Sequence, residues 1–247
     1  MAEQKPNRPF QRNEEHYMPG LETGRLIAAI LHLLWPFLTY LLMFHGYYES
    51  FLSQLFPVNH LTPERMMLYL SLDIFYGVRW AFGCMTMQSR NPLYWSIGFL
   101  GIFKFILHQV SYQVFSVIAF PGFLNTSPEL GLIDYIAAAG CIAGGVLQHG
   151  SEAQRYFFKR KNPGKLHTTG FFAWARFINH TGHMLRDVSA LLFAPANLFF
   201  WLLQLPFPFT RLQVVMKEGI EHMRKKYGKD YEEYEKKVPW LLVPGVY

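Results

Sequence analysis

The chain of 247 residues carries 51% hydrophobic, 17% aromatic and only 16% charged residues, with a net charge of +6. So many aromatic and so few charged residues exclude an intrinsically disordered protein, and two cysteines are too few for a disulfide-stapled scaffold. The apolar residues are gathered into long blocks separated by short polar stretches. This segregation predicts an all-α, polytopic membrane protein.

The first 24 residues are predicted to form a polar N-terminal tail. They hold three basic and four acidic residues, and they lack the order of charged, apolar and small residues that marks a cleaved signal peptide. The acidic residues also argue against a mitochondrial or plastid transit peptide. We therefore expect residues 1–24 to lie outside the membrane.

Four apolar blocks follow the tail, and each is predicted to be a membrane-spanning helix. A helix needs about 20 mostly apolar residues to cross roughly 30 Å of hydrocarbon. The blocks that meet this length are residues 26–44, 66–87, 93–120 and 130–147. We therefore assign residues 25–147 to a membrane region with four clear spans.

A fifth apolar stretch, residues 188–209, is interrupted by Pro195, Pro206 and Pro208. Because proline removes a backbone donor and breaks or kinks a helix, this stretch is not expected to be a plain span. We predict a broken helix or a helical hairpin instead.

The distribution of lysine and arginine fixes the relative sides of the membrane. With four spans, the N-terminal tail, the Arg90 loop and residues 148–170 place nine basic residues on one side, against one on the other. The last 38 residues hold eight more, which belong on the same basic side. Residues 171–209 must then enter the membrane and return. We expect a broken hairpin there, followed by an amphipathic surface helix over residues 211–237, with both termini on the basic side.

Five ionisable residues lie inside the predicted spans, where charges are costly and usually face the interior of a helix bundle. For Asp134 and Arg79, near the ends of their blocks, pairing or reaching to the interface is favoured over a functional role. Lys104 and His108 are four residues apart on one helix face. A role in helix–helix contact and a role in lining a pocket are equally supported for this pair. Asp73 is the fifth.

Three ordered motifs stand in the last 100 residues: KLHTTGFF at 165–172, ARFINHTGH at 175–183, and YGKDYEEY at 227–234 with a final LVPGVY. They resemble the C-terminal signature of the steroid 5-alpha-reductase-like membrane proteins, whose relatives include isoprenylcysteine carboxyl methyltransferases and phospholipid methyltransferases. The resemblance covers residues 148–247, which we treat as a reductase- or methyltransferase-like region.

The resemblance implies a cytosol-facing cofactor pocket that binds NADPH in the reductases and S-adenosylmethionine in the methyltransferases. A guanidinium and a carboxamide can bind phosphate, carboxylate and ribose groups, and glycine permits close backbone approach. The basic run 159–165 suits the more anionic NADPH, or alternatively a membrane surface. The candidate cofactor-binding residues are Lys165, Arg176, Asn179, Gly182, Tyr231 and Tyr234.

The sequence also departs from the signature at three positions. Phe177 replaces a histidine, His180 a tyrosine and His183 an acidic residue. Phenylalanine forms no hydrogen bond, and histidine does not replace a carboxylate that accepts from ribose hydroxyls. Together with His167, these histidines raise the possibility of a metal site. A metal ion needs three or four converging ligands, and we expect no metal site here. No catalytic residue can be assigned.

Three functions therefore remain open. The first is NADPH-dependent reduction of a steroid-like or other lipid enone. The second is a catalytically degenerate, structural or lipid-binding subunit of a larger membrane complex, with no cofactor. The third is S-adenosylmethionine-dependent methylation of a lipid or prenylcysteine. We expect membrane lipids and subunits of a complex as partners, no nucleic acid, and a location in the endoplasmic reticulum or the mitochondrial inner membrane.

Overall fold

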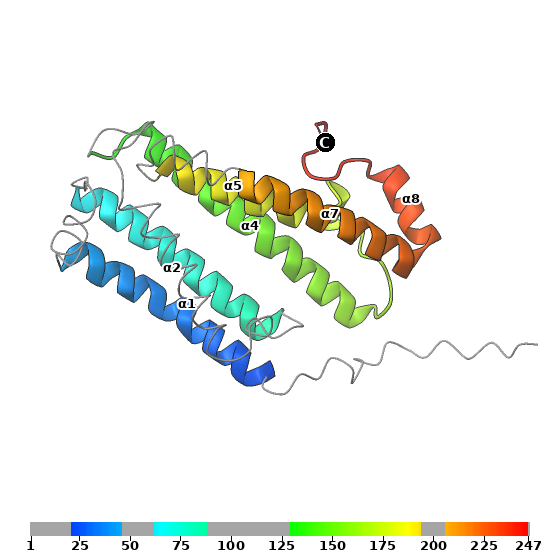
Figure 1. The fold of residues 1–247 in the computed structure, drawn as a ribbon, viewed down its shortest axis with the longest axis horizontal. Coiled ribbons are helices and arrows are strands. Elements are labelled where there is room, and N and C mark those ends of the chain that lie inside the picture. Colours follow the sequence, from blue (N-terminus) through cyan, green and yellow to red (C-terminus); the bar gives the residue numbers. More distant parts are fainter. Residues whose placement is uncertain (1–20, 46–61, 88–128, 194–205, 247) are drawn as a thin grey trace, which may run out of the picture.

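A computed structural model describes residues 21–45, 62–87, 129–193 and 206–246, and within these ranges the chain is helical and contains no strand. The all-α prediction is confirmed for this part of the chain. Figure 1 shows α1, α2, α4 and α5 lying side by side. The elements are α1 (Leu21–Phe44), α2 (Pro63–Thr86), α4 (Leu132–Lys161), the 3-10 turn η4 (Gly170–Ala173), α5 (Ile178–Phe193), α7 (Pro206–Tyr227) and α8 (Lys229–Lys237).

Two of the described helices are long and apolar enough to cross a membrane, namely the segment Thr23–Leu41 of α1 and the helix Leu132–Lys161. They indicate a membrane protein, but the prediction of four clear spans is wrong for the described residues. The second block does form a helix, α2, yet Asp73 and Arg79 interrupt its apolar sequence. The third block, with Lys104 and His108, lies outside the described residues.

Helix α4 is much longer than the predicted fourth block, because it continues through residues 148–161 instead of ending at residue 147. Its 30 residues give a length of about 45 Å, which exceeds the roughly 30 Å of bilayer hydrocarbon. It ends where Pro163 and Gly164, the latter with φ of 80°, cannot continue a helix. The division at residue 147 stays a prediction, since no break in α4 marks it.

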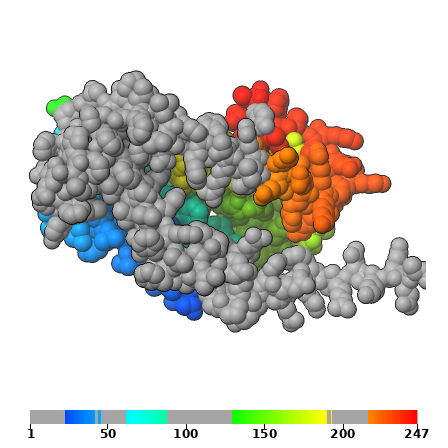
Figure 2. All heavy atoms as spheres, in the orientation of Figure 1, coloured from blue at the N-terminus to red at the C-terminus, as the bar shows by residue number. Residues whose placement is uncertain are grey.

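The C-terminal surface helix, predicted as one element over 211–237, is two helices. Gly228, with φ of 51°, separates α7 from α8. Met216 of α7 packs with Phe177 and Met184 at the start of α5, so α7 returns beside α5, as Figure 1 shows. Figure 2 shows α7, α8 and the chain end gathered at one end of the molecule. Residues 194–205 of the predicted hairpin lie outside the described residues.

Glycines bring α4 and α5 into backbone contact. A Cβ atom on Gly182 would lie 2.4 Å from the backbone N of Gln148 and 2.6 Å from the carbonyl of Gly144. A Cβ on Gly144 would in turn lie 2.6 Å from the backbone of Gly182 and of Arg186. Small residues of this kind let membrane helices approach closely. The contact sets the polar residues of both helices opposite each other.

Both carboxylates predicted to lie inside the spans, Asp73 and Asp134, accept hydrogen bonds within the bundle. Asp134 is 0% exposed and Arg65 is 2% exposed, and the Arg65 Nη2 atom lies 2.9 Å from Asp134 Oδ1. The other oxygen of Asp134 accepts from the backbone N–H of Gly131 at 2.9 Å. Asp73 accepts from the Thr39 hydroxyl at 2.6 Å. The structural interpretation of Asp134 is therefore confirmed.

Replacing Gly182 or Gly144 with alanine should destabilise the protein by about 1–3 kcal/mol, because the new methyl group meets backbone atoms that cannot move aside. Gly83→Ala is the matched control, since a Cβ there meets nothing closer than 3.5 Å. Thermal unfolding of the detergent-purified protein measures the effect. Equal melting temperatures for all three variants would show that the glycine contact is not needed.

Asp134→Ala should destabilise the protein by about 3–5 kcal/mol, because it leaves the buried Arg65 cation without its carboxylate. The double variant Arg65→Met/Asp134→Leu should recover most of this loss, since no charge is then left unpaired. Glu64→Ala, an exposed acid in the same turn of α2, serves as the control. A double variant no more stable than Asp134→Ala would refute the pairing argument.

Candidate functional site

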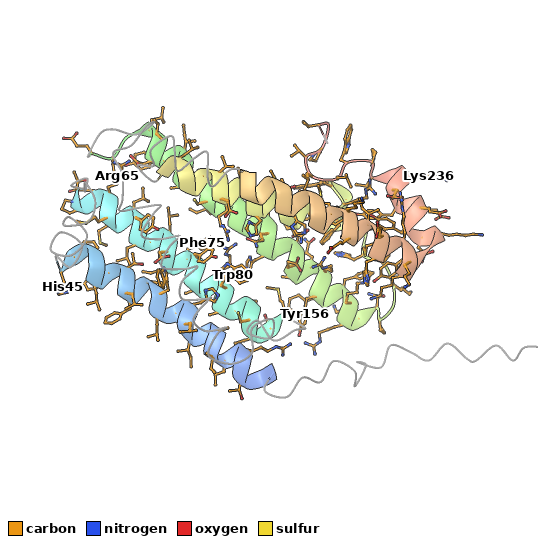
Figure 3. All side chains as sticks on the ribbon, viewed as in Figure 1. His45, Arg65, Phe75, Trp80, Tyr156 and Lys236 are labelled. Atoms are coloured by element: carbon orange, nitrogen blue, oxygen red, sulfur yellow. The ribbon has the colours of Figure 1, made fainter. Side chains whose placement is uncertain are left out.

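Polar side chains follow one face of α4 toward its C-terminal end. Gln148, Glu152, Arg155 and Lys159 recur at intervals of three or four residues, and such positions are neighbours on a helix surface. The glycine contact holds this face against the start of α5. The result is a polar stripe between α4, α5 and the C-terminal helices. It runs toward the end of the molecule where Figure 3 labels Lys236 of α8.

Arg176 lies at the centre of this end and is only 10% exposed. Its Nη1 atom donates to the Tyr231 hydroxyl at 3.3 Å and forms an ion pair with Glu235. Its Nη2 atom donates to the carbonyl of Pro239 at 3.3 Å, and its backbone N–H donates to the carbonyl of Trp240 at 3.0 Å. Arg176 thus fastens α8 and the C-terminal segment to the start of α5.

The two predicted tyrosines dock α8 onto the rest of the site. Tyr231 is 1% exposed and Tyr234 is 4% exposed. The Tyr234 hydroxyl donates to the carbonyl of Phe172 in η4 at 2.6 Å. Burial raises the pKa of Tyr231, against the opposing effect of the Arg176 charge, and burial likewise raises the pKa of Tyr234. Both hydroxyls are therefore protonated at neutral pH and act as hydrogen-bond donors or acceptors.

Asn179 contacts a carboxylate, that of Glu152, which the sequence analysis did not include in the site. Its Nδ2 atom donates to Glu152 Oε1 at 2.7 Å, and Glu152 also forms an ion pair with Arg155. The signal that could have found Glu152 is its position on the helix face of Gln148 and Arg155. That signal was missed because α4 was expected to end at residue 147.

The remaining predicted residues lie at opposite ends of the stripe. Lys165 is exposed, and its carbonyl accepts from the Lys159 ammonium at 2.8 Å. Gly182 is buried under α4, where it serves the packing of the two helices. The structure therefore gathers Arg176, Tyr231 and Tyr234, places Asn179 one helix turn along, and leaves Lys165 at the rim. Their role in binding a cofactor stays a prediction.

The three residues that depart from the signature have partners within the protein. Phe177 packs with Met216 and Leu242 and lies against Gly219 of α7. The His183 Nδ1 atom lies 2.7 Å from Asp187 Oδ2. The ring of His180 lies 5.9 Å from that of Phe177.

His167 is enclosed by aromatic rings, not by metal ligands. Its ring stacks on Phe158 at 4.5 Å and contacts Phe172 edge-on at 5.3 Å. Burial, with the charges of Lys159 and Arg155, lowers its pKa, so the imidazole is neutral at pH 7. Among the described residues no three His, Cys, Asp or Glu side chains come together to hold a metal ion.

Arg176→Ala should loosen α8 and cost about 1–3 kcal/mol, because it leaves the Tyr231 hydroxyl and the Pro239 carbonyl without their donor. Arg224→Ala removes the other arginine on Glu235, but Arg224 is 61% exposed, so it should cost less than about 1 kcal/mol. Limited proteolysis of the C-terminal segment and thermal unfolding measure both. Equal effects of the two variants would contradict the assigned role of Arg176.

Comparison with known proteins places similarity in this same part of the chain. Residues 147–247 match the model of the family described as "Ergosterol biosynthesis ERG4/ERG24 family". The Delta(14)-sterol reductase ERG24 of Saccharomyces cerevisiae is 29% identical over 142 residues, which cover 51% of this chain and 32% of the relative. The chain thus spans about a third of the length of that relative. The region that carries Arg176, Asn179 and the α8 tyrosines therefore lies within the match to this family.

Proposed function

We propose that this chain is a membrane-embedded reductase that uses NADPH to reduce a double bond in a steroid-like or other lipid enone. The observation that carries the proposal is the coincidence of two features. The region that matches the ERG4/ERG24 family, residues 147–247, is also the region in which Arg176, Asn179 and a set of lysines and arginines are gathered, and the chain is similar to a protein named as a sterol reductase. When bound, NADPH would supply the hydride.

The basic side chains at this end suit the phosphate groups of NADPH. Lys159 of α4 and Lys226 of α7 both lie over the ring of Tyr227, with their ammonium groups 4.6 Å and 5.4 Å from its centre. With Arg155 and the exposed Lys165 they form what we call the basic rim. Charge-assisted hydrogen bonds from lysine and arginine are the usual way in which proteins hold phosphate.

The pair formed by Glu152 and Asn179 suits the ribose hydroxyls. A carboxylate accepts hydrogen bonds from hydroxyl groups, and a carboxamide can both donate and accept. Glu152 would thereby supply from α4 the carboxylate that His183 does not offer on α5. We include Glu152 in the proposed cofactor site together with Arg176 and Lys165.

The methyltransferase alternative is less well supported. S-adenosylmethionine carries a sulfonium cation and has little need of the basic rim. The similarity to a protein named as a sterol reductase also favours reduction over methyl transfer.

A specific observation favours the second candidate, a degenerate lipid-binding or structural subunit. Arg176 is engaged by Glu235 and Tyr231, and Phe177 is packed with Met216 and Leu242. Groups that would contact a cofactor are thus occupied by the protein itself. In this case the chain would act with other subunits of a complex in the endoplasmic reticulum or the mitochondrial inner membrane, with its basic end on the cytosolic or matrix side.

Titration of the detergent-purified protein with NADPH, followed by the fluorescence of the nicotinamide, tests the proposal. We expect micromolar binding that Lys165→Ala weakens about tenfold, because one charge-assisted hydrogen bond is lost. Lys217→Ala, an exposed lysine elsewhere on α7, should leave the Kd unchanged. Glu152→Gln should also weaken binding, by removing the acceptor for the ribose.

The opposite result is equally informative. A folded protein that binds neither NADPH nor S-adenosylmethionine would refute the reductase and support the second candidate. Binding of S-adenosylmethionine alone would move the assignment to methyl transfer.

A further inference from the structure

A second group of polar residues lies deeper in the bundle and is not part of the proposed cofactor site. Arg79 extends from α2 to α4, where its Nη1 atom lies 2.9 Å from His149 Nδ1, 3.1 Å from Gln148 Oε1 and 3.3 Å from the carbonyl of Gly145. Figure 3 labels Phe75 and Trp80, which flank this position on α2. Arg79 therefore extends between α2 and α4, and its position relative to the membrane interface stays a prediction.

A second arginine approaches the same place from α5. The guanidinium carbons of Arg79 and Arg186 lie 5.0 Å and 4.9 Å from the ring centre of Tyr76. Arg186 donates through Nε to Asp187 Oδ1 at 2.9 Å, and the other oxygen of Asp187 is held by His183 at 2.7 Å. Three helices thus contribute to one cluster around Tyr76.

Among the described residues, the charges of this cluster do not balance. It holds two permanent cations and one carboxylate, and that carboxylate is already shared by Arg186 and His183. Among the described residues Arg79 forms no ion pair, and its buried Nε atom has no hydrogen-bond partner. A cation between apolar helices without a carboxylate is costly.

The neighbouring histidine does not supply the missing negative charge. A guanidinium has no acceptor atom, so the contact with His149 requires that Nδ1 accept and that the ring proton sit on Nε2. The His149 ring then packs edge-on against Trp80 at 5.2 Å, and the Phe75 ring lies 5.9 Å from the Arg79 guanidinium carbon. The surroundings of the cluster are therefore aromatic and apolar.

We propose that Arg79 and Arg186 form an internal anion-binding site that holds the carboxylate of a long-chain hydrophobic acid. The positive excess favours an anion over a neutral group, guanidinium groups bind carboxylates through paired hydrogen bonds, and the aromatic surroundings suit an apolar chain. The inference goes beyond the proposed function and does not rest on it, because none of these residues belongs to the basic rim or to the Glu152–Asn179 pair.

The test uses the full chain in a nonionic detergent at pH 8, with oleate as the probe and oleyl alcohol as a probe of the same chain without the charge. Binding is followed by the ligand-induced rise in melting temperature and by the Kd. We expect oleate to bind and oleyl alcohol to bind at least about tenfold more weakly. Arg79→Gln should weaken oleate about tenfold or more and leave oleyl alcohol unchanged. Arg160→Gln, an exposed arginine of α4, is the control and should leave both unchanged.

Equal binding of the two probes to the unaltered protein would overturn the proposal without any variant. So would oleate binding that survives both Arg79→Gln and Arg79→Lys, or that falls equally in Arg160→Gln. If Arg79→Gln does not fold, Arg79→Lys decides, since it keeps the charge but loses the paired hydrogen bonds and should give an intermediate Kd. Failure of NADPH binding leaves these outcomes untouched, so the two proposals fail separately.

Discussion

The close approach of α4 and α5 is the contact on which the rest of the described structure depends. Gly144 and Gly182 place backbone against backbone, and no other residue type would allow this separation. Because the two helices touch here, the carboxylate of Glu152 reaches Asn179, and Arg186 of α5 reaches the same tyrosine as Arg79 of α2. One packing contact therefore organises both polar groups.

Charged side chains among the apolar helices are stabilised in different ways in different parts of the bundle. Asp134 and Arg65 neutralise each other where both are buried, and the outer end of the stripe lies beyond the expected thickness of the hydrocarbon. The Arg79 cluster holds more positive than negative charge among the described residues. Proteins tolerate an excess of buried charge mainly where it serves a function. This cluster and the basic rim are therefore the two candidate binding sites of the molecule.

The all-helical fold followed from the length and spacing of the apolar blocks. The resemblance of short motifs to a known family assigned Arg176 and the two α8 tyrosines to one candidate site, and their role there stays a prediction. The length of α4 was not, because the polar residues after 147 looked like a loop although they continue the helical spacing. Glu152 was missed for the same reason. The partners of Arg79 could not be predicted, since they come from residues about 70 positions away, and a helix period does not specify which helix lies opposite.

The central claim, that residues 147–247 form a dinucleotide site, is tested most directly by hydrogen–deuterium exchange of the detergent-purified protein with and without NADPH. A bound dinucleotide should slow exchange at the C-terminal end of α4, around Arg176 and in α8, and leave α1 unchanged. NADP+ should protect the same peptides. Exchange rates that are the same with and without NADPH at saturating concentration would contradict the claim.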